Sequence, residues 1–163
     1  MSNTSSPSST PAERLISLGR HLPRVTSGSY SYDPVVVWND TGYVSGQIPK
    51  LDGVVAFTGA VWAAADVARG HEAAELCALN ALAQIDHAVG LDRVAQLLKL
   101  TVYVSSGPEF EDQPAVAEGA SRLLRSVLGE AGRHARTAIG VPRLPKNATV
   151  EIDLSLALHP SAH

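Results

Sequence analysis

The sequence predicts an α+β sandwich, in which one mixed sheet of six strands carries two long helices on one face. Three observations support this fold class. Two stretches repeat apolar residues at helical spacing, and several others are β-branched or alternate in polarity. Turn residues separate these stretches in the order β-β-(β)-α-β-α-β-β. The chain has 163 residues, of which 45% are hydrophobic, so it is long enough for one domain with a buried core.

The two ends of the chain are expected to lie outside this domain. Residues 1–11, MSNTSSPSSTP, are rich in Ser, Thr and Pro and lack the apolar stretch of a secretory signal, so we predict a disordered tail. A single domain over 12–158 and a short polar end over 159–163 follow. No segment approaches the roughly 20 apolar residues of a membrane span. The single cysteine, Cys77, excludes an internal disulfide and fits a cytoplasmic protein.

The first third of the domain predicts a short helix and a hairpin. Residues 12–19, AERLISLG, are compatible with a helix that ends at Gly19. DPVVVWND and TGYVSGQIP then give two β-branched and aromatic runs that meet at a turn over 39–42, which indicates a β-hairpin. LDGVVAFTGAV, residues 51–61, fits either a short strand or an ordered loop.

Two helices and one strand follow. Residues 65–89 have helical spacing, with Asp66 as a candidate N-cap, and residues 111–128 predict the second helix. Between them, residues 94–105 alternate in polarity. We expect one buried face of this strand, made by the following residues: Leu98, Leu100, Val102 and Val104.

Two strands, residues 135–141 and 148–158, complete the sheet. Two helices cover only one face of such a sheet. The other face carries aliphatic as well as charged residues, so we expect it to meet another copy of the chain rather than remain bare.

Arg136 and Glu151 lie in these last two strands, which the short turn between them predicts to be neighbours, and they are the candidates for chemistry. Small residues at 138 and 140 leave room beside Arg136, whose planar guanidinium suits a bidentate grip on a carboxylate. From spacing alone, an ordinary ion pair with a nearby acid is the favoured explanation of the arginine. Glu151 is either a solvent-facing side chain or a general acid or base that holds a water molecule.

A second group of candidates lies near the hairpin. Ser45-Gly46-Gln47 interrupts a strand, and a glycine there indicates a bulge or a close approach to a ligand. Tyr30 and Tyr32 either line a small-molecule pocket or pack in the fold. The six histidines show no metal-ligand spacing, so no metal site is expected. The net charge of −3 argues against a nucleic-acid partner.

The chain resembles the RidA (YjgF/UK-type) family, in a divergent form, over residues 30–155. The resemblance rests on YVSGQIP, on the helix EAAELCALNALAQIDHAVG, on the strand VAQLLKLTVYVSS and above all on ARTAIGVPRLPKNATVEID. In the last segment an arginine, a short strand, an LPK turn and a strand with a glutamate follow at specific separations.

The resemblance implies a chorismate-mutase-like (YjgF-like) fold and a homotrimer with active sites between subunits. It implies that Arg136 binds a substrate carboxylate and that Glu151 positions the hydrolytic water. Gly46 and Tyr32 correspond to the family's substrate glycine and pocket tyrosine, with Tyr30 as a competitor. The implied reaction is hydrolysis of an enamine or imine carboxylate to a 2-oxo acid and ammonia, without a metal or organic cofactor.

Two positions depart from the family pattern. Ala138 replaces a cysteine and Gly119 replaces an asparagine of the substrate pocket, so the pocket is expected to be larger and less polar. The substrate is therefore a different imine, enamine or enol, or the chain is a non-catalytic module that binds a small carboxylate or a protein. Ribonuclease activity, a label used for the family, is the least favoured alternative.

Overall fold

The structure is a computed structural model that describes residues 9–25 and 30–160. Residues 1–8 of the predicted tail and residues 161–163 of the predicted polar end lie outside the described residues. The helices are α1 (Pro11–Ser17), α2 (Val67–Val89) and α3 (Gln113–Leu128). The strands are β1 (Val35–Trp38), β2 (Thr41–Gln47), β3 (Lys50–Leu51), β4 (Val54–Val55), β5 (Val94–Ser105), β6 (Ala135–Val141) and β7 (Val150–Leu158).

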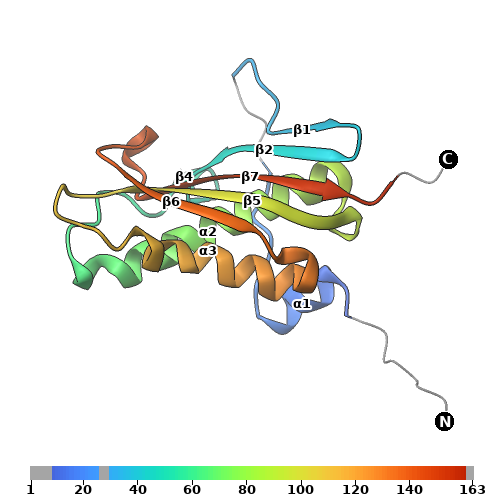
Figure 1. The fold of residues 1–163 in the computed structure, drawn as a ribbon, viewed down its shortest axis with the longest axis horizontal. Helices are drawn as coiled ribbons and strands as arrows, with labels where there is room; N and C mark the ends of the chain where they lie inside the picture. Colours follow the sequence, from blue (N-terminus) through green and yellow to red (C-terminus); the bar gives the residue numbers. More distant parts are fainter. Residues whose placement is uncertain (1–8, 26–29, 161–163) are drawn as a thin grey trace, which may run out of the picture.

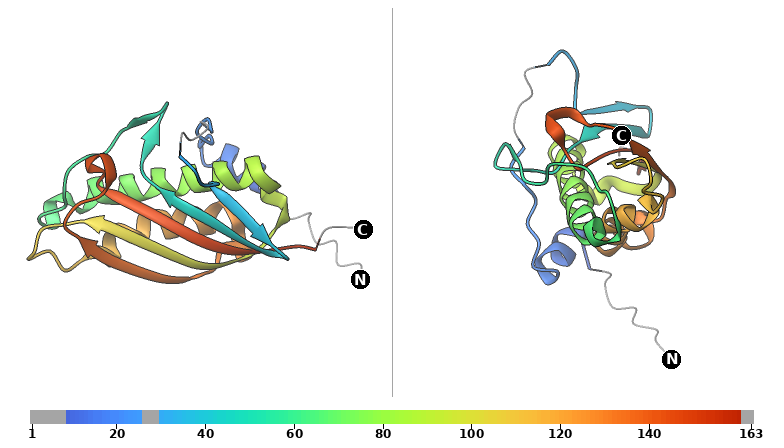
Figure 2. Two further views of the ribbon diagram at one scale, coloured as in Figure 1. Left: turned by 90° about the horizontal axis from the view of Figure 1, so that it is seen from above. Right: turned by 90° about the vertical axis from the view of Figure 1, so that its left-hand side faces the viewer.

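The main sheet has five strands in the order β1-β2-β7-β5-β6, and this number corrects the prediction of six. Residues 50–55 instead form a separate small hairpin of β3 and β4. All main-sheet pairs are antiparallel except β5 with β6, which makes the sheet mixed. The helices α2 and α3 run side by side across one face, and no described helix covers the other (Figures 1 and 2). The α+β fold class is confirmed.

The core lies between the sheet and the two long helices. β7 alternates along its whole length, with Ile152, Leu154 and Leu156 buried toward the helices. From α2 and α3, side chains including Leu82, Ile85, Leu124 and Val127 meet them. Burial of such side chains is worth about 1.5–3 kcal/mol each before the entropy of ordering is subtracted. The apolar faces of β7, α2 and α3 therefore form the core, as the hydrophobic pattern of the sequence predicts.

One strand departs from the simple alternation. β5 shifts register against β7 between Leu97 and Lys99, so that Leu97 is buried while Leu98 is 42% exposed. The prediction that Leu98 shares the buried face with Leu100 is wrong, because an irregular pairing changes which face each side chain occupies. After the shift, alternation resumes and Leu100 is fully buried.

Polar side chains stand at the starts of α1 and α2, but only those at α1 cap their helix. Thr10 and Glu13 form a capping box, so α1 begins at Pro11, inside the predicted tail. Asp66 directly precedes α2, but its carboxylate accepts hydrogen bonds from the backbone N–H groups of Trp62 (2.8 Å) and Ala63 (3.3 Å) in the preceding turn. These donors lower the pKa of Asp66. No helix of the described residues combines the length and apolar character that a membrane span requires.

Candidate functional site

Arg136 faces the helix layer from the edge strand β6. It pairs in register with Leu100 of β5, whose side chain is buried toward the helices. The Arg136 side chain is only 23% exposed, and its Nη1 donates hydrogen bonds to Glu118 Oε1 at 2.5 Å and to Ser121 Oγ at 3.1 Å. The guanidinium is thus held by α3 within its own chain.

Glu118 is the first partner of this arginine, and the sequence analysis did not identify it. Its carboxylate also lies 3.5 Å from Arg122 Nε, one turn further along α3. The hydrogen bond from Arg136 lowers the pKa of Glu118, so the pair is ionised at neutral pH. The available signal was the spacing of residues 118, 121, 122 and 125, which places polar side chains on one helix face.

Ser121 extends the contact to a histidine. Its hydroxyl lies 3.0 Å from His134 Nε2, and His134 Nδ1 lies 2.7 Å from the carbonyl oxygen of Gly132. A neutral His134 with its proton on Nδ1 satisfies both contacts, because it donates to the carbonyl and accepts from the serine. Ser121 then accepts from Arg136, so this small network fixes the guanidinium in place.

The Arg136 side chain opens onto a hollow of about 550 Å³ between α3 and β6. Its lining consists of Glu118, Ser121, Arg122, Arg125, Arg133, His134 and Arg136. The hollow is therefore strongly basic, whereas the chain as a whole has a formal charge of −3.

Glu151 lies on the opposite, helix-free face of the sheet. Its neighbours along β7, Val150 and Ile152, are both fully buried toward the helices. Burial, together with the nearby charge of Asp153, raises the pKa of Glu151 above its ordinary value. Asp153 itself accepts a hydrogen bond from Tyr103 at 2.9 Å, whereas Glu151 has no hydrogen-bond or ion-pair partner among the described residues. A carboxylate with a raised pKa and free oxygens is suited to accept and return a proton.

Gly46 lies directly against this carboxylate. The register between β2 and β7 shifts between Val44 and Gln47, which is the bulge expected from the glycine. A Cβ at Gly46 would collide with Glu151 Oε1, so only glycine leaves the carboxylate in this position. The adjacent Ser45 Oγ is buried and has no hydrogen-bond partner in the described part of the chain.

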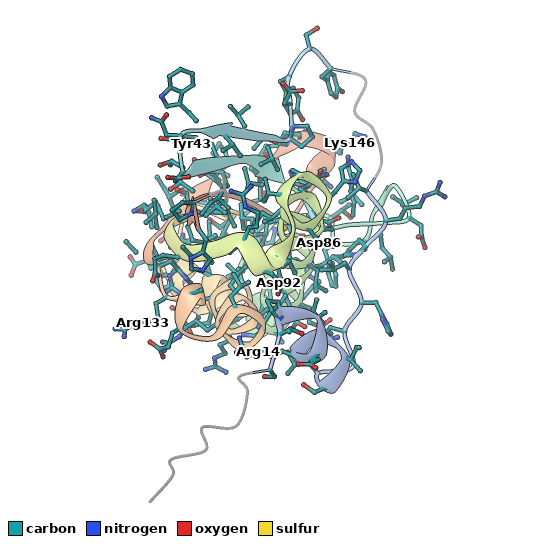
Figure 3. The ribbon with its side chains drawn as sticks, turned by 90° about the vertical axis from the view of Figure 1, so that its right-hand side faces the viewer. Arg14, Tyr43, Asp86, Asp92, Arg133 and Lys146 are labelled. Carbon is teal, nitrogen blue, oxygen red and sulfur yellow. The ribbon has the colours of Figure 1, made fainter. Side chains whose placement is uncertain are left out.

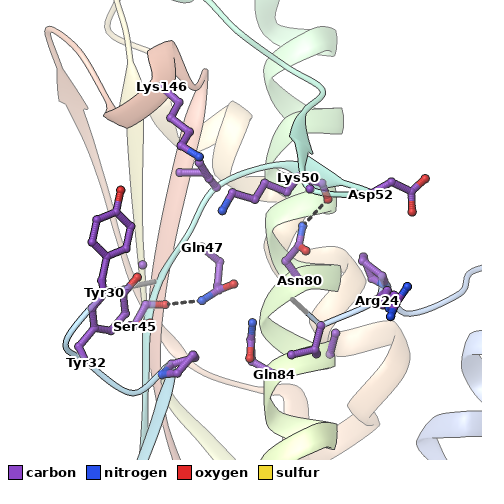
Figure 4. A pocket seen from close by; sticks show the side chains of 17 residues that line it. Arg24, Tyr30, Tyr32, Ser45, Gln47, Lys50, Asp52, Asn80, Gln84 and Lys146 are labelled. Atoms are coloured by element: carbon purple, nitrogen blue, oxygen red, sulfur yellow. Dashed lines mark hydrogen bonds between the residues drawn. The ribbon is translucent and has the colours of Figure 1, made fainter. Parts of the chain in front are cut away.

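Tyr30, Tyr32 and Gly46 line a second cavity, of about 270 Å³ (Figure 4). The two tyrosine rings stack with centroids 6.2 Å apart and remain exposed. The α2 side chains Asn80 and Gln84 form the opposite wall. Gln47 and Lys146 also line the cavity, and neither was among the predicted site residues. Lys146 comes from the LPK turn, where its φ of 54° directs the chain back toward β7.

The two departures from the family pattern lie away from both cavities. A Cβ at Gly119 would collide with the carbonyl oxygen of His71, so this glycine allows α3 to approach α2 closely. Ala138 is partly buried and packs against the core, opposite Val102 of β5. Neither residue lines the described cavities, and their role in substrate binding stays a prediction.

The predicted residues form two groups that one chain does not bring together. The short connection between β6 and β7 predicted that these strands are neighbours. This prediction is wrong, because β5 lies between them. Arg136 and Glu151 also occupy opposite faces. Gly46 lies three strands from β6, which is roughly 14 Å at about 4.8 Å per strand. Figure 3 shows Arg133 and Lys146, one from each cavity, on opposite sides of the molecule.

No group of three or more potential metal ligands occurs among residues 9–25 and 30–160.

Comparisons with known proteins identify close relatives. The family model that matches residues 12–158 is described as "YjgF/chorismate mutase-like, putative endoribonuclease". Protein TCP17 of Trypanosoma cruzi is 43% identical over 150 residues, or 91% of this chain and 94% of that protein. Atu1372 of Agrobacterium tumefaciens, a crystal structure of unknown function, is 43% identical with a TM-score of 0.84, over 91% of this chain and 92% of that one.

A crystal structure from Shewanella oneidensis, described as a putative endoribonuclease, is 34% identical with a TM-score of 0.87, over 92% of this chain and 100% of that one. More distantly, Escherichia coli TdcF with bound serine shares the fold at 22% identity and a TM-score of 0.56, over 83% of this chain and 93% of that one. The structures from Agrobacterium tumefaciens and Shewanella oneidensis have higher TM-scores than TdcF, so this chain is structurally more similar to those divergent relatives than to TdcF.

Proposed function

The chain belongs to the YjgF/chorismate mutase-like (RidA) family, and on this premise we propose that it hydrolyses a reactive enamine or imine carboxylate to a 2-oxo acid and ammonia. A related reaction on an imine or enol substrate of a specialised pathway falls within the same proposal. One observation carries it: the partly buried Arg136 opens onto a basic hollow, and Glu151, a carboxylate without a partner in the described part of the chain, lies against a glycine that leaves it room.

The chemistry requires positioning and one proton carrier. Arg136 grips the substrate carboxylate and so fixes the neighbouring iminium carbon. A water held by Glu151 attacks this carbon, and Glu151 accepts a proton from the water as the C–O bond forms. Glu151 then returns the proton to the nitrogen. The C–N bond breaks, ammonia leaves, and the remaining hydroxyl proton passes to it, giving the 2-oxo acid and an ammonium ion.

The proposal requires more than one chain, because Arg136 and Glu151 do not face one another within a chain. We therefore place the site between subunits of a homotrimer. Exposed apolar residues on the helix-free face support such an assembly. They include Val36, Tyr43 and Ile139, which are 50%, 56% and 47% exposed, respectively. A cytoplasmic location remains part of this proposal.

A second function, non-catalytic binding of a small carboxylate, is favoured by the contact between Arg136 and Glu118. A ligand carboxylate competes with Glu118 for this guanidinium, whose Nε and Nη2 groups can also donate to it. TdcF, which shares the fold, was crystallised with a small carboxylate, serine. Calorimetry with 2-oxo acids tests this function: binding that depends on Arg136 without any turnover of imino acids would favour it.

The proposed hydrolase is tested with imino acids generated in the assay by an amino acid oxidase, while ammonia release is followed. We expect the wild-type protein to release ammonia above the spontaneous rate and Arg136→Ala to fall to that rate. Arg143→Ala, at an exposed arginine that lines neither cavity, is the matched control. Circular dichroism checks that each variant folds. Identical wild-type and Arg136→Ala traces at the background rate would rule out the hydrolase.

Endoribonuclease activity, which appears in the names of relatives, predicts a different result. Purified protein would cleave RNA, and Glu151→Ala would abolish the cleavage. We expect no cleavage that follows the protein through purification, because the net charge is −3 and the hollow that gathers four arginines is small for a nucleic-acid surface.

A further inference from the structure

The basic hollow beside Arg136 holds more positive charge than one carboxylate ligand needs. Four arginines line it, namely Arg122, Arg125, Arg133 and Arg136, and among the described residues Glu118 is the only acidic one that does so. Counted over these four arginines and Glu118, the lining has a surplus of three positive charges. Gathering like charges costs free energy, and a bound anion offsets that cost.

The partners of these arginines leave this charge available. Glu118 alone serves both Arg136, at 2.5 Å, and Arg122, at 3.5 Å. Arg133 lies 3.4 Å from Glu130, but both side chains are largely exposed, and such pairs contribute little. Arg125 has no hydrogen-bond or ion-pair partner among the described residues. A ligand that binds Arg136 therefore finds further unneutralised guanidinium groups beside it.

The helix sets the spacing between Ser121, which Arg136 contacts, and Arg125. Arg136 contacts Ser121, and Arg125 follows Ser121 by four residues on the same face of α3. Four residues of an α-helix span about 6 Å. A five-carbon chain with a carboxylate at each end spans roughly 5 Å, given carbon–carbon bonds of about 1.5 Å. Arg125 thus lies within reach of a small bifunctional anion.

We propose that the hollow binds a small ligand with two anionic groups, of which Arg136 holds one and Arg125 with Arg122 holds the other. For the proposed hydrolase, the substrate class is then the imine or enamine of a dicarboxylic or phosphorylated 2-oxo acid. This inference rests on the proposed function, because it takes Arg136 as the site of the first carboxylate.

Calorimetry with three probes tests the inference on the full-length protein. The probes are 2-oxobutyrate with one carboxylate, 2-oxoglutarate with two, and phosphoglycolate with a carboxylate and a phosphate. We expect at least one dianion to bind roughly fivefold or more tightly than 2-oxobutyrate, and the tighter dianion identifies the second group. Raising the salt concentration should weaken dianion binding more steeply, because screening acts on the additional charge.

The variant Arg125→Gln makes the test specific. It should bring the ratio of dianion to 2-oxobutyrate affinities close to one, whereas the matched control Arg143→Gln should leave the ratio unchanged. Arg125 is exposed and has no partner among the described residues, so its replacement should not disturb folding.

Equal affinities for all three probes, unchanged in Arg125→Gln, would overturn this inference and leave the hydrolase proposal intact. If none of the three probes bound in a way that depends on Arg136, both this inference and the hydrolase proposal would be overturned.

Discussion

Arg136, which we propose as the substrate-binding arginine, has a glutamate of its own chain as its nearest partner. Glu118 Oε1 lies 2.5 Å from Arg136 Nη1 in a partly exposed setting, where ion pairs are worth about 0.2–1 kcal/mol. A ligand carboxylate makes the same kind of contact and can add a second parallel hydrogen bond. We therefore expect Glu118 to compete with small carboxylates for Arg136 without preventing their binding.

The competition predicts that Glu118→Gln binds 2-oxobutyrate more tightly, by roughly two- to fivefold, because the free energy of breaking the pair is no longer subtracted. Glutamine keeps the shape and removes the charge. Calorimetry on wild type and variant measures the change, with Glu72→Gln on the exposed surface of α2 as control. Unchanged affinity would show that ligands leave the Glu118 contact in place.

Glu151 gives a prediction with opposite effects on stability and activity. Burial and Asp153 raise its pKa in the folded chain above 4.5, so its ionised form costs stability at neutral pH. This cost disappears as the pH falls through the raised pKa. We expect Glu151→Gln to raise Tm at pH 7 by up to roughly 2 °C, after allowance for solvent screening, with little difference at pH 4.

The same variant should lose about 100-fold or more in ammonia release, because the proton carrier is gone. Thermal unfolding at the two pH values and the imino acid assay measure the two effects. A variant that is less stable at pH 7, or as active as the wild type, contradicts the role given to Glu151.

At the scale of elements, the bulge in β2 places the backbone against Glu151. Gly46→Ala should leave stability nearly unchanged, because residue 46 is exposed, but should reduce turnover severely, because the new Cβ displaces the carboxylate. Gly42→Ala in the same strand is the control, since its Cβ would press on Leu156 in the core at 3.1 Å. We expect that control to lose stability and keep its activity per folded molecule. Thermal unfolding and ammonia release separate the two outcomes, and the reverse pattern would contradict the proposed geometry.

Local sequence patterns predicted the helices and strands well, but they predicted poorly which strands pair with one another in the sheet. The limits of β5, the hairpin of β1 and β2, and the two long helices follow from periodicity and turn residues. The insertion of β5 between β6 and β7 depends on long-range pairing, which no local pattern encodes. Leu98 was misplaced because a register shift has no sequence signature here. Glu118 was missed because its importance depends on a contact between residues 18 positions apart.

At the scale of the whole molecule, the two parts of the proposed site lie near opposite edges of one sheet. Arg136 belongs to the edge strand β6, whereas Gly46 and the second cavity belong to β2 and its surroundings. Cyclic assembly of copies brings one edge of a chain beside the other edge of the next. In such a ring, each complete site combines Arg136 of one subunit with Glu151 of its neighbour.

Mixed assemblies test this arrangement directly. Arg136→Ala and Glu151→Gln are each expected to be inactive alone. Co-expressed in equal amounts, they should form rings in which about a quarter of the interfaces join an intact Arg136 to an intact Glu151, since each requirement is met half of the time. Ammonia release should then recover to roughly a quarter of the wild-type value. If Arg136 and Glu151 instead acted within one chain, ammonia release would not recover at all, because every subunit carries one of the two substitutions. Native mass spectrometry, which resolves the mass difference between the two variants, shows whether the mixed assemblies have formed.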